Sequence, residues 1–307
     1  MKIAAVQMKA KFSKVRDNLQ KAESLVKDAF RDGAEWVILP EFFTTAMGFH
    51  PDMLRSARSI NGKPFQLMKR LARENNGVVG GSFIALWKDI RLNTFILVFP
   101  DGSVYLHNKD LPTMWEYCYY LGGNDDGILD TPKGKIGVAL CWEFVRSQTA
   151  NRLYNKVDIV IGGSCWWTLP KKHVPGFPTK IHHENMEIML NTPSKFAKML
   201  GVHVIHAAHA GNFECKMPLM PFFSYESYYL GETQIVNGAG KILTRMKYED
   251  GEGFIIADID IQKKWDPSEP IPNRFWIPKL PPQLKLVWWY QKYHGKIVYQ
   301  RKLKSNY

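Results

Sequence analysis

The sequence is poor in cysteine and contains no long apolar run. Its four cysteines, Cys118, Cys141, Cys165 and Cys215, show neither CxxC pairing nor the density of a disulfide scaffold. No run reaches the ~18 apolar residues needed to span a bilayer, and the first residues form too short an apolar stretch for a secretion signal. These absences predict a cytoplasmic protein whose thiols stay reduced.

Acidic residues are outnumbered by basic ones, and the excess is partly local. The chain has 41 Lys and Arg against 29 Asp and Glu, a net charge of +12. From Lys279 to Tyr307 there are seven Lys or Arg and no acid, interleaved with Trp and Tyr. We interpret this segment as an arm that packs on another subunit of a homodimer or larger homo-oligomer. An anionic membrane surface is the alternative partner. Without a reading motif, no nucleic-acid partner is expected.

The apolar pattern alternates between strand and helix periods. Predicted strands cover residues 2–8, 36–39, 78–86, 94–99, 104–107, 136–140, 158–161, 202–207, 234–236 and 242–245, and predicted helices cover 15–30, 147–154 and 184–200. Asp101-Gly102 and Asn237-Gly238 are the expected hairpin turns. Helices that cover one face of each of two sheets indicate an α/β sandwich. With no linker before about residue 262, we predict one domain over 1–261 and a basic, aromatic extension over 262–307.

Three residues capable of chemistry stand just after predicted strands: Glu41, Lys109 and Cys141. A free thiol has a pKa of about 8.5, so it needs a base or a positive field to act at neutral pH. A buried carboxylate can be that base, and a lysine can stabilise the oxyanion that forms on attack. Together they provide a nucleophile, a proton shuttle and an electrophile, and the chemistry would run through a thioester.

The segments that carry these residues resemble the nitrilase superfamily of carbon–nitrogen hydrolases. The matching stretches are Leu39-Pro-Glu-Phe-Phe-Thr-Thr-Ala-Met-Gly48, Asn108-Lys-Asp-Leu-Pro-Thr-Met-Trp-Glu116 and Gly137-Val-Ala-Leu-Cys-Trp-Glu143. The resemblance implies Glu41 as general base, Lys109 as catalytic lysine, Cys141 as nucleophile and Glu116 as the second active-site glutamate. It also implies a four-layer αββα sandwich of two mixed sheets flanked by helices, with no metal or cofactor.

Several further residues are candidates for binding the substrate. Trp142, Trp166 and Trp167 are interpreted as an aromatic wall, with core or subunit contact as the open alternative. Glu143 follows the nucleophile, and His209 lies in a stretch after a predicted strand that family members use to contact substrate. His203, His206 and His209 also suggest a metal triplet. A spacing of three within a strand places neighbours on opposite faces, so we favour hydrogen-bonded structural histidines.

The motifs divide on the substrate. The Cys141-Trp142-Glu143 run and the spacing from Lys109 to Glu116 lean toward nitrilases, whereas the stretch around Glu41 looks more like amidases or carbamoyl amidohydrolases. Many short-chain amidases of the family have Arg four positions after the cysteine, but here Val145 stands there and Arg146 follows it. A small linear amide or N-carbamoyl compound is the first expectation and a nitrile the second. An inactive scaffold that binds a partner through its tail is the alternative of another class.

Overall fold

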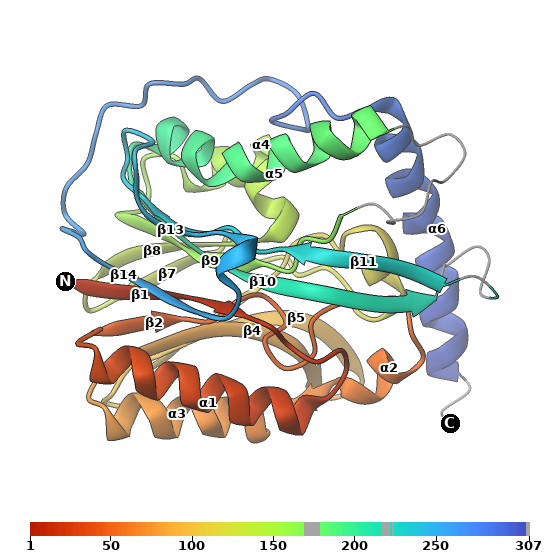
Figure 1. The fold of residues 1–307 in the computed structure, drawn as a ribbon, viewed down its shortest axis with the longest axis horizontal. Helices are drawn as coiled ribbons and strands as arrows, with labels where there is room; N and C mark the ends of the chain where they lie inside the picture. The colour runs from red at the N-terminus through yellow and green to blue at the C-terminus, as the bar shows by residue number, and fades with distance from the viewer. Residues whose placement is uncertain (169–178, 217–221, 223, 305–307) are drawn as a thin grey trace.

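Two stacked sheet layers lie between two helical layers, so the predicted αββα sandwich is confirmed (Figure 1). The computed structural model describes residues 1–168, 179–216, 222 and 224–304. Helices α1 (Val15–Arg31) and α3 (Lys63–Glu74) cover one outer face, and α4 (Ser147–Leu153) and α5 (Thr179–Leu200) cover the other. Apolar residues at helical spacing on α1, including Ala22, Val26 and Ala29, pack against the sheet.

The first sheet layer mixes parallel and antiparallel strands in the order β6-β5-β4-β2-β1. Strand β14 pairs with the other side of β1 and the short β3 pairs with β4. The strands are β1 (Lys2–Met8), β2 (Trp36–Ile38), β3 (Arg58–Ser59), β4 (Val78–Trp87), β5 (Ile90–Val98), β6 (Val104–Asn108) and β14 (Gly253–Asp258).

The second sheet layer continues in the order β10-β9-β8-β7. Strands β11 and β12 pair with β10, and β13 pairs with β12. The strands are β7 (Ile128–Thr131), β8 (Gly134–Leu140), β9 (Ile159–Ser164), β10 (His203–Lys216), β11 (Ser224–Leu230), β12 (Thr233–Val236) and β13 (Ile242–Met246). A short pairing of β1 with β10, at Gln7–Ala208 and Met8–His209, joins the two layers.

The faces of the two layers pack on each other through fully buried aliphatic and aromatic side chains. Ile3, Ile38 and Phe95 of the first layer share one apolar cluster with Ile136 and Ile161 of the second. Strands buried on both faces read as continuous apolar runs, as these do. This core fixes the backbone of each strand that leads to a candidate catalytic residue.

Strand direction brings the three candidate catalytic segments to one edge. Strands β1, β2 and β4 are parallel, as are β1, β10, β9 and β8. Strand β6 is antiparallel to β5, which is antiparallel to β4, so β6 also runs in the common direction. Glu41 follows β2, Lys109 follows β6 and Cys141 follows β8. All three therefore stand beyond carboxyl ends at the same edge of the sandwich.

The predicted elements are present, but α2 (Asp52–Ser56), α3, β3, β7, β11 and β14 were not predicted, and three further differences concern strand length, a turn and the C-terminus. Strands β5 and β10 are longer than predicted, because β5 starts at Ile90 and β10 continues to Lys216. The predicted Asp101-Gly102 turn is confirmed, with Gly102 at φ +91°. The turn after β12 is longer than the predicted Asn237-Gly238 pair, since Asn237 N–H bonds to the carbonyl of Lys241 and Gly240 takes the positive φ.

The third difference is that the C-terminal segment forms a long helix, which the sequence patterns had not indicated. Residues 262–281 cross the layer of α4 and α5, and α6 (Pro282–Lys304) then runs along the edge of the sandwich (Figure 1). Helix α6 packs on the 3-10 helix η1 (Met114–Cys118). In the described ranges, no helix combines the length and the apolar character needed to cross a membrane.

The contact between α6 and η1 is made at backbone distance and requires a glycine. A Cβ added to Gly295 would lie 2.5 Å from the Cβ of Tyr117 and 3.0 Å from its carbonyl carbon. Because η1 also contains Glu116, any displacement of α6 at this point moves a candidate site segment.

We predict that Gly295→Ala destabilises the protein. An alanine inside a helix normally stabilises it by about 1 kcal/mol relative to glycine, but overpacking against Tyr117 costs about 1–3 kcal/mol. Urea unfolding of the variant measures the sign of the change in the free energy of unfolding. Gln300→Ala, on the exposed side of α6, is the control. A variant more stable than wild type would show that α6 does not pack closely on η1.

Candidate active site

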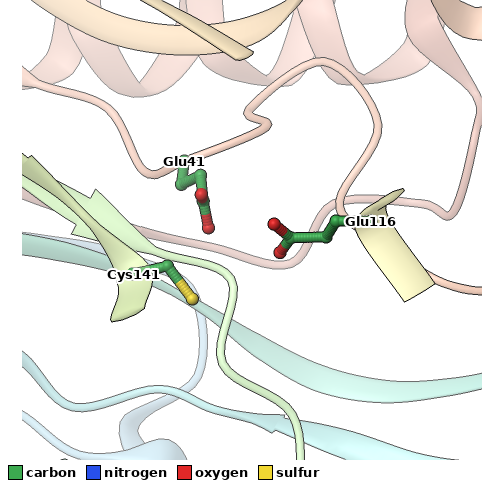
Figure 2. Close-up of side chains that lie close together, drawn as sticks. All are labelled: Glu41, Glu116 and Cys141. Carbon is green, nitrogen blue, oxygen red and sulfur yellow. The ribbon is translucent and has the colours of Figure 1, made fainter. Parts of the chain in front are cut away.

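The side chains of Glu41, Glu116 and Cys141 converge on one small space (Figure 2). A carboxylate oxygen of each glutamate and the thiol sulfur all lie within 4.8 Å of one another. The two glutamates have no exposed surface, and Cys141 is 1% exposed. Residues separated by as much as 100 positions in the sequence thus form one buried cluster.

The ammonium of Lys109 lies between the two carboxylates of this cluster. Its Nζ donates to Oε1 of Glu41 and to Oε2 of Glu116, both at 2.8 Å. Burial lowers the pKa of Lys109, but attraction to Glu116 and Glu41 outweighs burial and the pKa is raised overall. A Glu-Glu-Cys group is also a possible set of metal ligands, but here Lys109 supplies the positive charge that the carboxylates need.

The carboxylate of Glu41 has two hydrogen-bond partners besides Lys109. Oε1 accepts a hydrogen bond from Nδ2 of Asn93 at 2.8 Å, and Oε2 accepts one from the N–H of Cys165 at 3.1 Å. Burial raises the pKa of Glu41 to about 7, against the opposing field of Lys109 and with help from Glu116. A carboxyl group whose pKa lies near neutrality can both take and return a proton at pH 7.

Cys141 begins the 3-10 helix η2 (Cys141–Val145), directly after β8. Its φ of +52° lies in the left-handed region, which is uncommon for a residue with a side chain. This sharp bend directs the thiol into the cluster. Burial, reinforced by Glu41, raises the pKa of the Cys141 thiol well above its usual value. The thiol is therefore protonated at rest, and attack requires that a neighbouring base remove its proton.

Glu116 is fixed by the start of η1. Its Oε2 accepts the N–H of Thr113 at 2.7 Å and the hydroxyl of Tyr120, while Thr113 caps the same turn. Oε1 is buried and has no hydrogen-bond partner in the described part of the chain. An unsatisfied buried carboxylate oxygen is costly, so a substrate N–H is a natural partner for it.

Glu143, predicted to bind substrate, has its carboxylate turned toward the protein main chain. Oε2 accepts the N–H of Leu140 at 2.8 Å and Oε1 accepts the N–H of Asp110 at 3.0 Å. Nε2 of His107 lies 3.0 Å away and completes a buried ion pair. Although burial opposes it, attraction to Glu143 raises the pKa of His107 to about 9. Glu143 thus ties the residue before Cys141 to the residue after Lys109.

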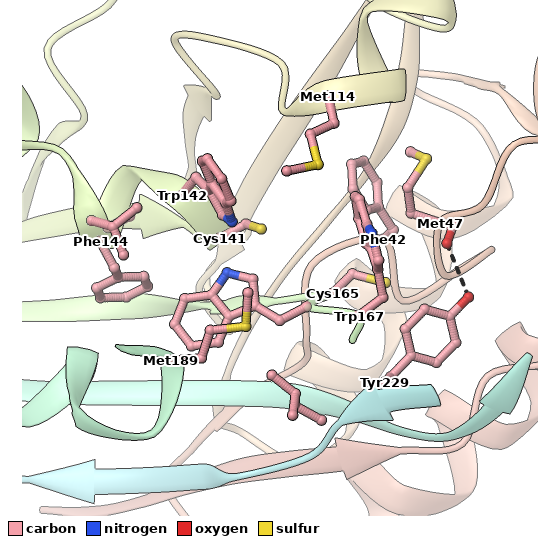
Figure 3. Close-up of a cluster of buried hydrophobic side chains, with 14 of the residues drawn as sticks. Phe42, Met47, Met114, Cys141, Trp142, Phe144, Cys165, Trp167, Met189 and Tyr229 are labelled. Atoms are coloured by element: carbon pink, nitrogen blue, oxygen red, sulfur yellow. Dashed lines mark hydrogen bonds between the residues drawn. The ribbon is translucent and has the colours of Figure 1, made fainter. Parts of the chain in front are cut away.

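The three candidate tryptophans lie in the apolar cluster around the site. Trp142 packs edge-on against Trp276, Trp166 lies 5.0 Å from the ring of His206, and Trp167 stacks on Trp115 with centroids 4.5 Å apart. Figure 3 shows Trp142 and Trp167 in the cluster that contains Cys141. Trp166 Nε1 is buried without a partner in the described residues. Their role in binding substrate stays a prediction.

The ring of His209 contacts the main chain of the segment that carries Glu41. Its Nε2 lies 2.8 Å from the carbonyl oxygen of Glu41 and its Nδ1 lies 3.1 Å from that of Met8. His206 contacts Ser164, and His203 packs edge-on against Trp265. The three histidine rings therefore have separate neighbours, and a role of His209 toward substrate stays a prediction.

Some residues that shape the site were missed by sequence reasoning. Asn93 hydrogen-bonds Glu41, and Tyr120 hydrogen-bonds Glu116. In the sequence, each is only a polar group in an apolar segment, which is weak evidence for a role in the site. Arg146 is buried, with its guanidinium on Asp110 and on the carbonyl oxygens of Trp142 and Leu111. Only Thr113 had a readable signal, because the Thr-x-x-Glu pattern that ends at Glu116 is a capping box.

Comparison with known proteins gives a consistent result. Residues 2–264 match the carbon-nitrogen hydrolase family. The chain is 30% identical to omega-amidase NIT2-B of Xenopus laevis, with 84% of this chain and 88% of the relative covered. It is 26% identical to nitrilase 3 of Arabidopsis thaliana, covering 85% of this chain and 79% of that protein.

A solved structure supports the fold. It is a mutant of an amidase from Nesterenkonia sp. AN1 that shows Michael addition of acrylamide at the active-site cysteine. The two structures superpose with a TM-score of 0.65 at 16% identity, over 85% of this chain and 93% of the other. The match over most of the chain and the similarity to NIT2-B lead to one conclusion: this protein belongs to the carbon–nitrogen hydrolase family.

Proposed function

We propose that the protein hydrolyses a carbon–nitrogen bond of a small linear amide or N-carbamoyl compound through a thioester on Cys141. The observation that carries this proposal is the buried cluster in which the thiol lies beside two carboxylates bridged by Lys109. Family membership supports the reaction class, and the relatives include both amidases and nitrilases. No cofactor enters the proposed reaction.

The groups of the cluster account for each proton transfer. Glu41 takes the proton of Cys141, and the thiolate attacks the carbonyl carbon, whose oxygen becomes negative. Lys109 Nζ and the main-chain N–H of Trp142 stabilise this oxyanion. On collapse, Glu41 returns the proton to the leaving nitrogen, and ammonia or an amine departs. Glu41 then takes a proton from water, which attacks the thioester, and Cys141 recovers its proton as the acid is released.

Two observations favour an amide or carbamoyl substrate. The first argues against a nitrile and the second argues against a dicarboxylate monoamide. Oε1 of Glu116 is a buried acceptor with no partner in the described residues. A substrate NH₂ group can satisfy this oxygen, whereas a nitrile has no N–H to donate. The guanidinium of Arg146 is engaged by Asp110, so it does not offer a cation to a second carboxylate. Nitrile conversion to a carboxylic acid and ammonia remains the second candidate.

The proposal requires a reduced thiol, and the four cysteines are free and buried. A reducing compartment, the cytoplasm, is therefore the proposed location. The predicted homodimer or larger homo-oligomer also stays a proposal.

We predict that Cys141→Ala lowers turnover at least about 10⁴-fold, because it removes the nucleophile. Ammonia and amine release is measured against a panel of linear amides, N-carbamoyl compounds and nitriles. Cys165→Ala is the matched control, because Cys165 hydrogen-bonds Glu41 through its main-chain N–H, which alanine retains. Equal activity of wild type and Cys141→Ala would end the cysteine mechanism. If the folded wild type released neither ammonia nor amine from any compound of the panel, the inactive scaffold would be favoured.

We predict that kcat/KM rises with pH through about 7, because the carboxylate form of Glu41 is the base. The raised pKa keeps Glu41 protonated below that pH, so activity falls about tenfold per pH unit there. Glu41→Gln should abolish the reaction, and Glu74→Gln on the surface of α3 should leave the profile unchanged. A rising limb centred near the ordinary pKa of a glutamate would show that burial does not tune Glu41.

We predict that Glu143→Gln lowers kcat about 100-fold with little change in KM. Both carboxylate oxygens accept main-chain N–H groups, so an amide can satisfy only one of Leu140 and Asp110. The resulting shift misplaces Cys141 or Lys109, and misplacement by about 1 Å costs roughly this factor. Asp130→Asn, at an exposed position of β7, is the control. A raised KM with unchanged kcat would instead support the prediction that Glu143 binds substrate.

A further inference from the structure

The outward side of α6 is a stripe of large apolar side chains. Leu286, Trp289, Tyr290, Tyr293 and Ile297 are between 39% and 66% exposed. Their spacing of three and four residues places them on one face of the helix. Contiguous exposed apolar surface of this kind marks an interaction site on soluble proteins.

The opposite side of α6 is already covered by the protein. Leu284, Gln291 and Tyr299 are buried, and Gly295 lies against η1. The helix is thus apolar on both sides, with one side packed and one side open. A helix that is apolar all round is normally buried. We therefore expect a binding partner to cover the exposed stripe.

The charge on α6 restricts what that occupant can be. At 100° per residue, Lys285, Lys292 and Lys296 form a row along one border of the stripe, and Arg301 lies along the other. From Lys279 to Tyr307 the chain has seven cations and no acidic residue. The partner surface must therefore accept apolar side chains in its centre and supply negative charge around them.

We propose that α6 docks this stripe on the surface of an anionic phospholipid bilayer. Trp and Tyr suit the interface between acyl chains and headgroups, while Leu286 and Ile297 reach the apolar side. Flanking lysines remain at the level of the lipid phosphates and gain from the negative surface potential. The helix lies flat on the membrane and does not cross it.

A second copy of this chain fits the stripe less well when the contact is α6 on α6. A two-fold contact would bring two rows of lysine together, with no acid on either helix to pair with them. A nucleic acid would satisfy the lysines but would leave the aliphatic side chains of Leu286 and Ile297 without apolar partners.

The position of α6 links this surface to the active site. The docking proposal does not depend on the proposed reaction. Helix α6 packs on η1, which contains Glu116, at the edge where the parallel strands end (Figure 1). Docking would therefore turn the active-site edge of the sandwich toward the lipid surface.

The test is co-sedimentation of the full chain with vesicles of phosphatidylcholine alone or mixed with phosphatidylserine. We expect binding to the mixed vesicles and little to phosphatidylcholine alone. Lys285→Gln with Lys296→Gln should weaken binding about tenfold, since each cation near an anionic surface contributes to affinity. The control, Lys63→Gln with Lys69→Gln on α3, removes the same charge elsewhere and should bind as wild type does.

A second variant tests the apolar stripe without changing charge. Leu286→Ser with Trp289→Ser and Tyr293→Ser alters only exposed side chains, and retained circular dichroism and thermal unfolding check its fold. We expect this variant to lose vesicle binding at unchanged molar mass by light scattering. No wild-type binding to mixed vesicles, equal binding to both kinds, or a variant whose mass falls while vesicle binding persists would overturn the proposal.

Discussion

The ammonium of Lys109 is the charge on which the arrangement of this site depends. Two carboxylates without exposed surface face each other across the cluster, and burial without a cation would be very costly for them. Lys109 hydrogen-bonds both at 2.8 Å and so allows them to be held close together next to a thiol. In the proposed reaction, the same cation would stabilise the negative oxygen that forms on attack. Lys109 would then both neutralise the buried carboxylates and take part in catalysis.

Holding that cation in place requires a rigid frame, which the second carboxylate network provides. Glu143 accepts main-chain N–H groups from both sides of the site, and the ring of His107 lies between the carboxylates of Asp125 and Glu143. Charged hydrogen bonds to a main chain restrict its movement strongly. The loops after β6 and β8 are therefore coupled to each other as well as to their strands. The contacts of Glu143 thus show a structural role, and its binding of substrate stays a prediction.

The strand order and the motifs allowed the positions of the candidate catalytic residues to be predicted from the sequence. Features that depend on tertiary packing were not predicted. Strand ends at Glu41, Lys109 and Cys141 were readable because apolar runs of strand length stop there. The partners Asn93 and Arg146 were not, since nothing local shows that they meet residues far along the chain. Helix α6 was missed because it is apolar on two faces, and the usual contrast between a polar and an apolar side is weak.

Each candidate catalytic segment also turns through a residue with positive φ that is not glycine: Phe42 at +54°, Met114 at +51° and Cys141 at +52°. Such a conformation costs about 1–3 kcal/mol at each position and persists only where the surroundings enforce it. Glycine would remove this cost, but Phe42 and Met114 fill the apolar cluster that excludes water from the thiol. The strain is therefore retained because the same residue must both bend the chain and close the site. Burial in turn raises the pKa of Glu41 toward neutrality, so backbone strain, packing and the proposed proton transfer depend on one another.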